Sequence, residues 1–257
     1  MKMGYEIHAE TRSVQQRPTA GPGPGSRRRR WDGATVSNFI LIPGAGGAAW
    51  YWSRVLPLLH EAGHEAVAVD LPGDDESAGL PEYSRLVLEA IGGRDDVVLV
   101  AQSLGGFTAP LVCDRASVRE LVLVNAMIPV PGETPGAWWD NTGWAAAQQS
   151  AAKAHGYSAE FDTDTYFLHD ISPGIAAEGE PHQRPEANAV FESVCNFTEW
   201  PRIPTRVLSG EADRFFPLDF QQRVARERLG VEPDVVPGGH LLALANPDGV
   251  ANYLLHR

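Results

Sequence analysis

The sequence predicts an α/β fold in which a mostly parallel, doubly wound sheet carries a helical lid insertion. Three observations indicate this fold. Short, continuous apolar runs end in chain breakers, stretches with helical spacing lie between these runs, and one long aromatic-rich segment interrupts the alternation. Because right-handed crossovers bring the carboxyl ends of parallel strands to one edge, we expect a functional site at that edge.

The expected strands are short apolar runs of the kind that is buried on both faces of a parallel sheet. They cover residues 39–43, 66–73, 97–103, 120–126, 205–210 and 233–238. Between them, apolar residues recur at intervals of three and four, which predicts helices. The expected helices cover residues 52–60, 83–91, 105–115, 218–229 and 241–255.

Residues 129–204 break the alternation, since this segment is too long for a connection between neighbouring elements. Its apolar residues fall at helical spacing, and many of them are aromatic. We interpret the segment as a helical lid over the sheet edge, which leaves residues 38–128 and 205–257 as the core. Residues 1–37 are rich in Pro, Gly and Arg without a periodic apolar pattern, and we expect a disordered tail there.

The composition argues against several classes of partner. The formal net charge is −12, and an acidic protein repels the phosphates of nucleic acids. No apolar run approaches the roughly 20 residues that span a bilayer. The two cysteines, Cys113 and Cys195, suggest neither a disulfide framework nor a metal cluster, which is compatible with a reducing cytoplasm.

The stretch VLVAQSLGGFTAP, residues 98–110, places Ser103 on the turn between an expected strand and an expected helix. A nucleophilic serine on such a turn needs small residues two positions before and after it, because larger side chains would collide with the strand and the helix. Ala101 and Gly105 meet this need, although glycine is usual at both positions. The alternative is a serine that only caps the helix.

A serine hydroxyl needs a base that takes its proton, and we expect this base on a loop at the same sheet edge. In VVPGGHLLALANP, residues 235–247, His240 follows an expected strand and two glycines and precedes an expected helix. Six of the other histidines lie on or just after the first expected helix, in the insertion or near the C-terminus. An ordinary loop histidine is the alternative for His240.

The imidazole in turn needs a carboxylate that holds its tautomer and stabilises its protonated form. The stretch VLSGEADRFFP, residues 207–217, ends a strand and offers Glu211 and Asp213. We prefer Asp213 because it lies further out on the loop. Glu211 is the alternative acid, and capping of the following helix is the alternative role of Asp213.

An oxyanion that develops on a substrate needs preorganised N–H donors. The backbone N–H of Leu104 directly follows the serine, at the positive end of the expected helix. The stretch IPGAGGAAW, residues 42–50, follows the first expected strand, and its glycines would let the backbone approach a substrate. We choose Ala45 as the second donor, with a glycine-rich turn that binds no ligand as the alternative.

These segments together resemble the α/β-hydrolase superfamily, and within it the small serine esterases of the plant methyl-ester hydrolase and hydroxynitrile lyase branch. The resemblance begins near residue 38 and runs to the end of the chain. It is carried by LIPGAGGAAWYWSRVLPLLHEAGHEAVAVDLPG, AQSLGG, GEADRFFP and GGHLLALANP. It implies that Ser103, Asp213 and His240 form a catalytic triad, in the chain order that this fold uses, and that Ala45 and Leu104 supply the oxyanion hole.

Some positions depart from the family pattern. The family usually has His-Gly where this chain has Pro43-Gly44, and the N-terminal strands of larger members are not evident. The lyases carry a lysine where Leu241 stands and a threonine where Gly44 stands, which argues against cyanohydrin cleavage. Ser103 excludes the aspartate nucleophile of epoxide and haloalkane hydrolases.

The resemblance therefore implies a cofactor-free serine hydrolase, first of all a carboxylesterase that cleaves a small to medium apolar ester through an acyl-enzyme. The alternatives are a C–C hydrolase, a lactonase or an acyltransferase of secondary metabolism, or a non-catalytic ligand-binding member of the fold. We expect a cytoplasmic protein without a metal, and we leave a homodimer open. The expected lining of the substrate pocket is Trp138, Trp139, Trp144, Phe167 and Phe215.

Overall fold

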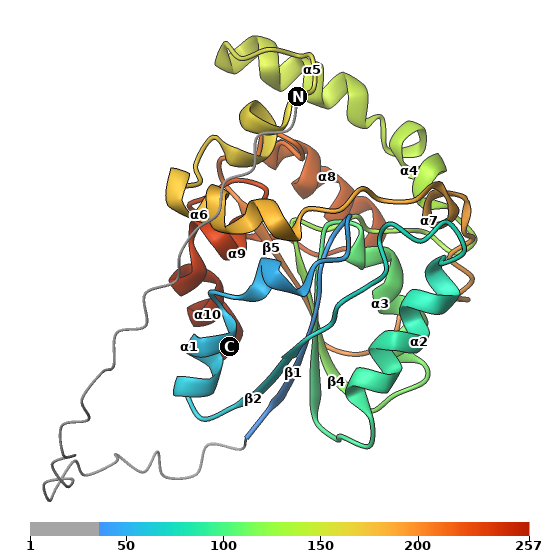
Figure 1. Cartoon of the computed structure of the whole chain (residues 1–257). Helices are drawn as coiled ribbons and strands as arrows, with labels where there is room; N and C mark the ends of the chain where they lie inside the picture. Colours follow the sequence, from blue (N-terminus) through green and yellow to red (C-terminus); the bar gives the residue numbers. More distant parts are fainter. Residues whose placement is uncertain (1–35, 257) are drawn as a thin grey trace, which may run out of the picture. The chain divides into compact units, whose positions relative to one another are not determined.

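The computed structural model describes residues 36–256, so the expected tail at residues 1–37 lies outside the described residues except for its last two. The core of the described part is a six-stranded parallel sheet with the strand order β2-β1-β3-β4-β5-β6. The strands are β1 (Asn38–Ile42), β2 (Glu65–Ala68), β3 (Val97–Gln102), β4 (Val118–Val124), β5 (Thr205–Gly210) and β6 (Asp234–Val236). This sheet and its interleaved helices confirm the predicted fold class (Figure 1).

The two faces of the sheet are covered by different helices. One face packs against α2 (Leu80–Ile91), α3 (Gly105–Cys113) and α8 (Leu218–Leu229). The other face packs against α1 (Leu56–Glu61), α9 (Leu242–Ala245) and α10 (Pro247–Leu255). Neighbouring strand residues alternate between the two hydrophobic clusters, because successive side chains of a strand point to opposite faces.

Two expected helices are interrupted in the structure. Residues 241–255 form α9 and α10 rather than one helix, since Pro247 has no N–H to continue the first helix. Asn246 takes a non-helical conformation between them and accepts a hydrogen bond from the Gly249 N–H. Residues 52–60 likewise divide into the end of the short 3₁₀ helix η1 (Ala49–Trp52) and most of α1.

The insertion at residues 129–204 is helical in the structure. It contains α4 (Pro135–Thr142), α5 (Trp144–His155), the π-helical turn η2 (Asp164–Leu168), α6 (Pro173–Gly179), the 3₁₀ turn η3 (Glu180–His182) and α7 (Asn188–Glu192). These elements lie beyond the carboxyl ends of the strands, at the top of Figure 1. Its role as a lid stays a prediction. Among residues 36–256, we find no helix with the length and apolar character that a bilayer span requires.

Helix α3 lies unusually close to the connection that follows β4. A Cβ atom on Gly106 would stand 1.9 Å from the carbonyl oxygen of Met127, which is backbone and cannot rotate away. The helix can therefore reach this position only with glycine at residue 106. This close approach fixes the first turn of α3 against the end of the sheet.

We predict that Gly106→Ala lowers the free energy of unfolding by about 3 kcal/mol, because the helix must move away from the sheet to relieve the overlap. The measurement is urea unfolding followed by circular dichroism. Gly174→Ala in α6 is the control, since a Cβ atom there meets nothing within 4 Å. An unchanged stability of Gly106→Ala beside an unchanged control would contradict this close packing.

Candidate active site

Ser103 occupies the turn between β3 and α3, as the sequence predicts, and its backbone φ is +49°. A left-handed conformation of this kind costs a non-glycine residue about 1–3 kcal/mol, so neighbouring contacts have to hold it. The Ser103 carbonyl accepts hydrogen bonds from the N–H groups of Gly106 at 3.0 Å and Met127 at 2.9 Å. The Ser103 N–H donates to the carbonyl of Val124 at 3.3 Å.

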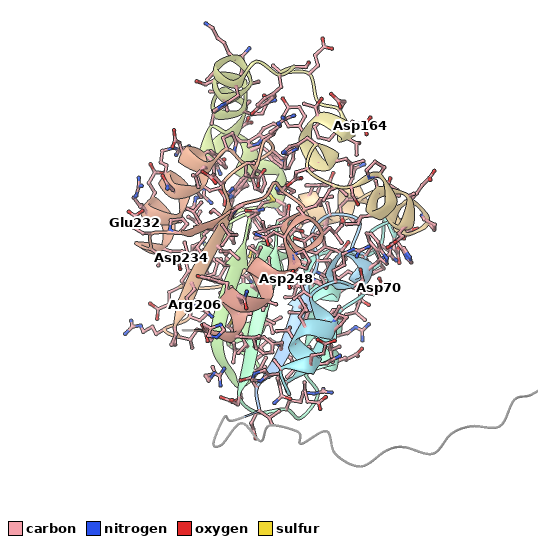
Figure 2. All side chains as sticks on the ribbon, turned by 90° about the vertical axis from the view of Figure 1, so that its left-hand side faces the viewer. Asp70, Asp164, Arg206, Glu232, Asp234 and Asp248 are labelled. Carbon is pink, nitrogen blue, oxygen red and sulfur yellow. The ribbon has the colours of Figure 1, made fainter. Side chains whose placement is uncertain are left out.

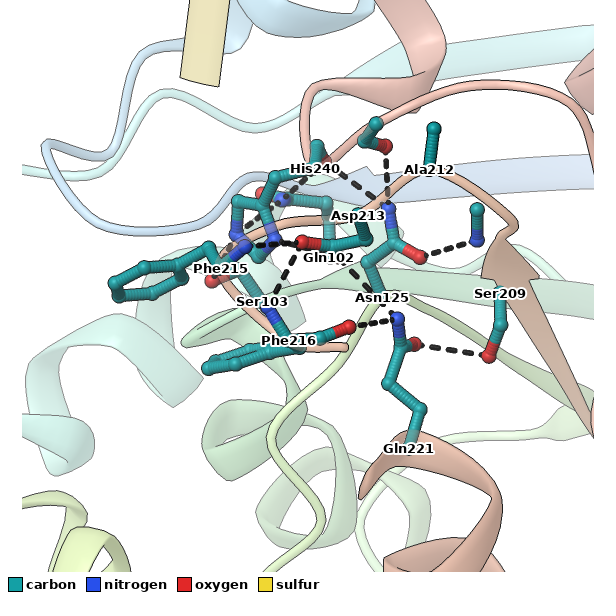
Figure 3. Close-up of polar contacts among 12 residues, drawn as sticks. Gln102, Ser103, Asn125, Ser209, Ala212, Asp213, Phe215, Phe216, Gln221 and His240 are labelled. Atoms are coloured by element: carbon teal, nitrogen blue, oxygen red, sulfur yellow. Dashed lines mark hydrogen bonds and ion pairs between the residues drawn. The ribbon is translucent and has the colours of Figure 1, made fainter. Parts of the chain in front are cut away.

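Three side chains from distant parts of the chain form one hydrogen-bonded series (Figure 3). The distance from Ser103 Oγ to His240 Nε2 is 3.0 Å, and the distance from His240 Nδ1 to Asp213 Oδ2 is 2.9 Å. All three residues are buried. An ionised carboxylate can only accept, so Nδ1 carries the hydrogen and Nε2 presents a lone pair to the serine hydroxyl.

The carboxylate of Asp213 is held by groups other than the histidine. Its Oδ1 accepts the backbone N–H groups of Phe215 at 2.9 Å and Phe216 at 2.8 Å. Gln221 of α8 donates to Oδ2 at 3.3 Å, and the Ser209 hydroxyl in turn donates to Gln221. The orientation of Asp213 is therefore set independently of His240. The alternative acid, Glu211, is exposed.

Asn125 connects the ends of β4 and β5 with residues 237–241, the histidine loop between β6 and α9. No pattern in the sequence indicates this role. Its amide nitrogen donates to the carbonyls of Gly239 at 2.9 Å and His240 at 3.1 Å, and its amide oxygen accepts the Gly210 N–H at 2.7 Å. The side chain is fully buried and the backbone φ is +44°. Asn125 thus fixes the backbone of His240 by satisfying polar groups that water cannot reach.

Three aromatic rings surround the imidazole of His240. The ring centroids of Phe167, Phe215 and Phe216 lie 5.2, 5.0 and 4.9 Å from that of the imidazole. These rings keep water away from much of the hydrogen-bonded series. In such an environment, the electrostatic interactions between the three polar side chains are stronger than in water.

A cavity of about 400 Å³ opens beside Ser103 and His240. Its volume lies in the range that is typical of small-molecule sites. Its wall is mostly apolar and is built from the loop after β1, the turn after β3, the insertion and the histidine loop. Members of this wall include Ala45, Trp50, Tyr51, Leu104, Met127, Ile171, Ile175, Phe191, Leu241 and Leu244.

The five aromatic residues expected in the pocket divide into two groups. Trp139, Phe167 and Phe215 line the cavity. Trp138 and Trp144 are absent from its lining, and this corrects their expected placement. Trp138 is fully buried with its indole N–H on the Ile128 carbonyl, and Trp144 donates to the carbonyl of Phe215. Their rings pack against Trp139, so both support the wall from behind.

The two residues expected to supply N–H donors, Ala45 and Leu104, both line the cavity. Within residues 36–256, neither backbone N–H donates to a protein acceptor. The Gly44 carbonyl accepts the Gly47 N–H at 3.1 Å. The Gly44 carbonyl and the Ala45 N–H belong to the same trans peptide and point in opposite directions. Because the carbonyl points into the turn, the Ala45 N–H points out of it.

A charged cluster that the sequence analysis missed lies at the cavity wall beside this loop. Glu186 accepts the Gly46 N–H and the Tyr83 hydroxyl, each at 2.5 Å. The Arg184 guanidinium donates to the Gly46 carbonyl at 3.0 Å and pairs with Asp70, which is labelled in Figure 2. Burial raises the pKa of Glu186 above its usual value, although these donors oppose the shift. No motif marks Arg184 or Glu186, because their partners are distant in sequence.

The comparisons with known proteins agree with this architecture. The model of the alpha/beta hydrolase family matches residues 39–253, and the chain belongs to this family. Among solved structures, polyneuridine aldehyde esterase superposes with a TM-score of 0.68 at 18% sequence identity, covering 86% of this chain and 98% of that one. At this identity the likeness shows the fold alone.

Curated relatives match a shorter part of the chain. Methylesterase 7 from Arabidopsis thaliana is 38% identical over 104 residues, which cover 35% of this chain and 40% of the relative. The alpha-hydroxynitrile lyase of the same plant is 31% identical over 110 residues, covering 38% and 43%. The chain thus spans about two fifths of the length of these relatives, and they confirm the predicted resemblance to this plant branch as a distant homology.

We predict that Asn125→Ala lowers the free energy of unfolding by about 3 kcal/mol, since it leaves buried backbone groups without a partner. Urea unfolding measures the change. Asn252→Ala on the exposed face of α10 serves as the control and should stay within about 0.5 kcal/mol of the parent protein. Equal stability of the two variants would show that Asn125 does not hold the three segments together.

The raised pKa of Glu186 predicts a pH dependence of stability. A carboxyl whose pKa is higher in the folded than in the unfolded chain costs no stability while both states are protonated, and it costs stability progressively as pH rises through the two pKa values. The Tm of Glu186→Gln minus that of the parent should therefore increase from acidic pH towards neutral pH. Thermal melts across this range test the sign, and a difference that stays constant or decreases contradicts it.

Proposed function

We propose that the chain is a serine carboxylesterase that cleaves a small to medium apolar ester through an acyl-enzyme. The observation that carries this proposal is the continuous series from Asp213 through His240 to Ser103 at the wall of an apolar cavity. Membership of the alpha/beta hydrolase family and distant homology to a methylesterase support it.

In the first half of the proposed reaction, Ser103 Oγ attacks the acyl carbon while Nε2 of His240 takes the hydroxyl proton. Asp213 stabilises the imidazolium that forms. The carbonyl oxygen becomes an oxyanion and binds to the N–H groups of Ala45 and Leu104. The imidazolium then gives its proton to the alkoxy oxygen, the bond between that oxygen and the acyl carbon breaks, and the alcohol leaves an ester on Ser103.

In the second half, water attacks the acyl carbon and gives its proton to Nε2 of His240. The tetrahedral intermediate again places its oxyanion on the N–H groups of Ala45 and Leu104. When it collapses, Ser103 Oγ leaves the acyl carbon and recovers the proton from His240. The carboxylic acid is released, and the side chains return to their starting protonation states.

The oxyanion assignment is supported by the absence of a protein acceptor for either N–H among the described residues. Leu104 directly precedes α3, where the helix dipole favours negative charge. The apolar wall supports an apolar acyl or alcohol group rather than a charged one. Leu241, where the lyases carry a lysine, lines the cavity and supports ester hydrolysis over cyanohydrin cleavage.

The insertion is the proposed lid because it contributes Trp139, Phe167 and Phe191 to the cavity wall. Its side chains would select the substrate by shape. A lactonase and an acyltransferase would attack the same kind of acyl carbon. A C–C hydrolase would instead attack the carbonyl carbon of a ketone. Product analysis with water alone and with an added alcohol acceptor distinguishes a hydrolase from an acyltransferase.

We predict that Ser103→Ala reduces hydrolysis of p-nitrophenyl butyrate at least about a thousandfold and prevents labelling by a fluorophosphonate, because the nucleophile is lost. Release of p-nitrophenol and mass spectrometry of the labelled peptide are the measurements. A parent protein that gives neither turnover nor an adduct at Ser103 would instead be a non-catalytic ligand-binding member of the fold.

We predict that Asp213→Asn lowers kcat about a thousandfold to ten-thousandfold, because an amide no longer holds the imidazole in the required tautomer. Glu211→Gln on the same loop is the matched control and should keep kcat within about twofold of the parent, since Glu211 is exposed. The reverse ranking of the two variants would transfer the acid role to Glu211.

A further inference from the structure

Two carboxylates of the insertion bind the two backbone loops that flank the reacting groups. Glu186 accepts the N–H of Gly46, the residue after Ala45, and Asp170 accepts the N–H of Gly239, the residue before His240. We propose that Asp170 and Glu186 are positioning residues. They hold the oxyanion loop, residues 43–48 after β1, and the histidine loop in place relative to Ser103. This inference rests on the proposed ester hydrolysis.

Glu186 joins the oxyanion loop to the core. One carboxylate oxygen accepts the Gly46 N–H and the other accepts the hydroxyl of Tyr83, which is buried in α2. The loop is therefore connected through Glu186 to a helix of the sheet layer. The Gly46 N–H belongs to the peptide group that directly follows the one carrying the Ala45 N–H, so fixing the Gly46 peptide restricts how far the Ala45 peptide can move.

Arg184 fixes the same loop from its carbonyl side. Its Nε donates to the Gly46 carbonyl at 3.0 Å, and its two terminal nitrogens donate to Asp70 at 3.1 and 3.0 Å. A Cβ atom on Gly46 would stand 2.6 Å from the Arg184 carbonyl oxygen, and the Gly46 φ is +81°. Gly46 is thus bound on both of its peptide groups, and only glycine fits between its neighbours.

Asp170 acts in the same way on the histidine loop. Its Oδ2 accepts the Gly239 N–H at 2.5 Å, while Asn125 binds the Gly239 carbonyl at 2.9 Å. His169, the preceding residue, contacts the carbonyl of Ala212 at 3.1 Å and so reaches the loop of Asp213 as well. The backbone on both sides of the imidazole is held from the insertion and from the sheet.

Through these contacts, the insertion would position the backbone around the reacting groups as well as cover the cavity. An oxyanion site works because its donors are oriented before the reaction, and a displacement of about 1 Å can cost about a hundredfold in rate. Within residues 36–256, neither Asp170 nor Glu186 forms a hydrogen bond with Ser103. Removing one of them should therefore keep the reacting side chains but displace the N–H donors or the base. The effect should fall on kcat more than on KM.

We predict that Glu186→Ala and Asp170→Ala each lower kcat for p-nitrophenyl butyrate by about tenfold to a hundredfold, with KM changed by less than about threefold. Glu186→Gln and Asp170→Asn keep an acceptor oxygen and should recover most of the loss. The matched control is Glu178→Ala in the same insertion. Glu178 is exposed and pairs with Arg54, so its loss should leave kcat unchanged.

Hydrogen exchange followed by mass spectrometry measures how firmly the two loops are held, and it does not require an active enzyme. Peptides that cover residues 44–50 should exchange faster in Glu186→Ala, and peptides that cover residues 237–241 should exchange faster in Asp170→Ala, because the Gly46 and Gly239 amides lose their acceptors. The two alanine variants thus serve as each other's control for the location of the change.

The two proposals fail in different ways. A parent protein without turnover and without a Ser103 adduct contradicts the ester hydrolysis, and the exchange rates then still decide whether the carboxylates hold the loops. Unchanged exchange in both alanine variants overturns the positioning role. An unchanged kcat in an active enzyme, or a loss that the amide variants do not recover, overturns it as well.

Discussion

The imidazole of His240 has to reach two side chains that lie 27 and 137 residues away in sequence. The parallel sheet makes this possible because the carboxyl ends of its strands share one edge. The four consecutive strands β3, β4, β5 and β6 each lead to one residue of the arrangement, namely Ser103, Asn125, Asp213 and His240. Asn125 follows β4, the strand between those that lead to Ser103 and Asp213, and its side chain donates to the His240 carbonyl.

The cavity lies where the order of the sheet reverses. The chain passes from β1 outward to β2 and then returns to β3 on the other side of β1. The loop after β1 and the turn after β3 are therefore neighbours, and they carry Ala45 and Leu104. Loops diverge at such a switch point, which leaves room for a ligand between them. The insertion covers this space with a mostly apolar wall, which also includes Arg184 and Glu186.

Polar and apolar groups have separate tasks around the cavity. Phe167, Phe215 and Phe216 enclose the imidazole and strengthen its hydrogen bonds by excluding water. The buried polar side chains behind them are satisfied by backbone groups, as Asn125 and Asp213 illustrate. These polar side chains can be buried away from water because each already has hydrogen-bond partners in the folded protein. The exposed Glu211 has no comparable surroundings.

Local sequence determined the alternation of strands and helices, the turn of Ser103 and the loops of Asp213 and His240. Each of these depends on apolar periodicity or on small residues at a fixed spacing, which neighbouring residues reveal. Tertiary structure decided that Trp139 faces the cavity while Trp138 and Trp144 stand behind it, since all three share the same helical, aromatic pattern. It also decided that Asp170 and Glu186 hold distant glycines, because a hydrogen bond to a backbone N–H leaves no mark on the sequence of either partner.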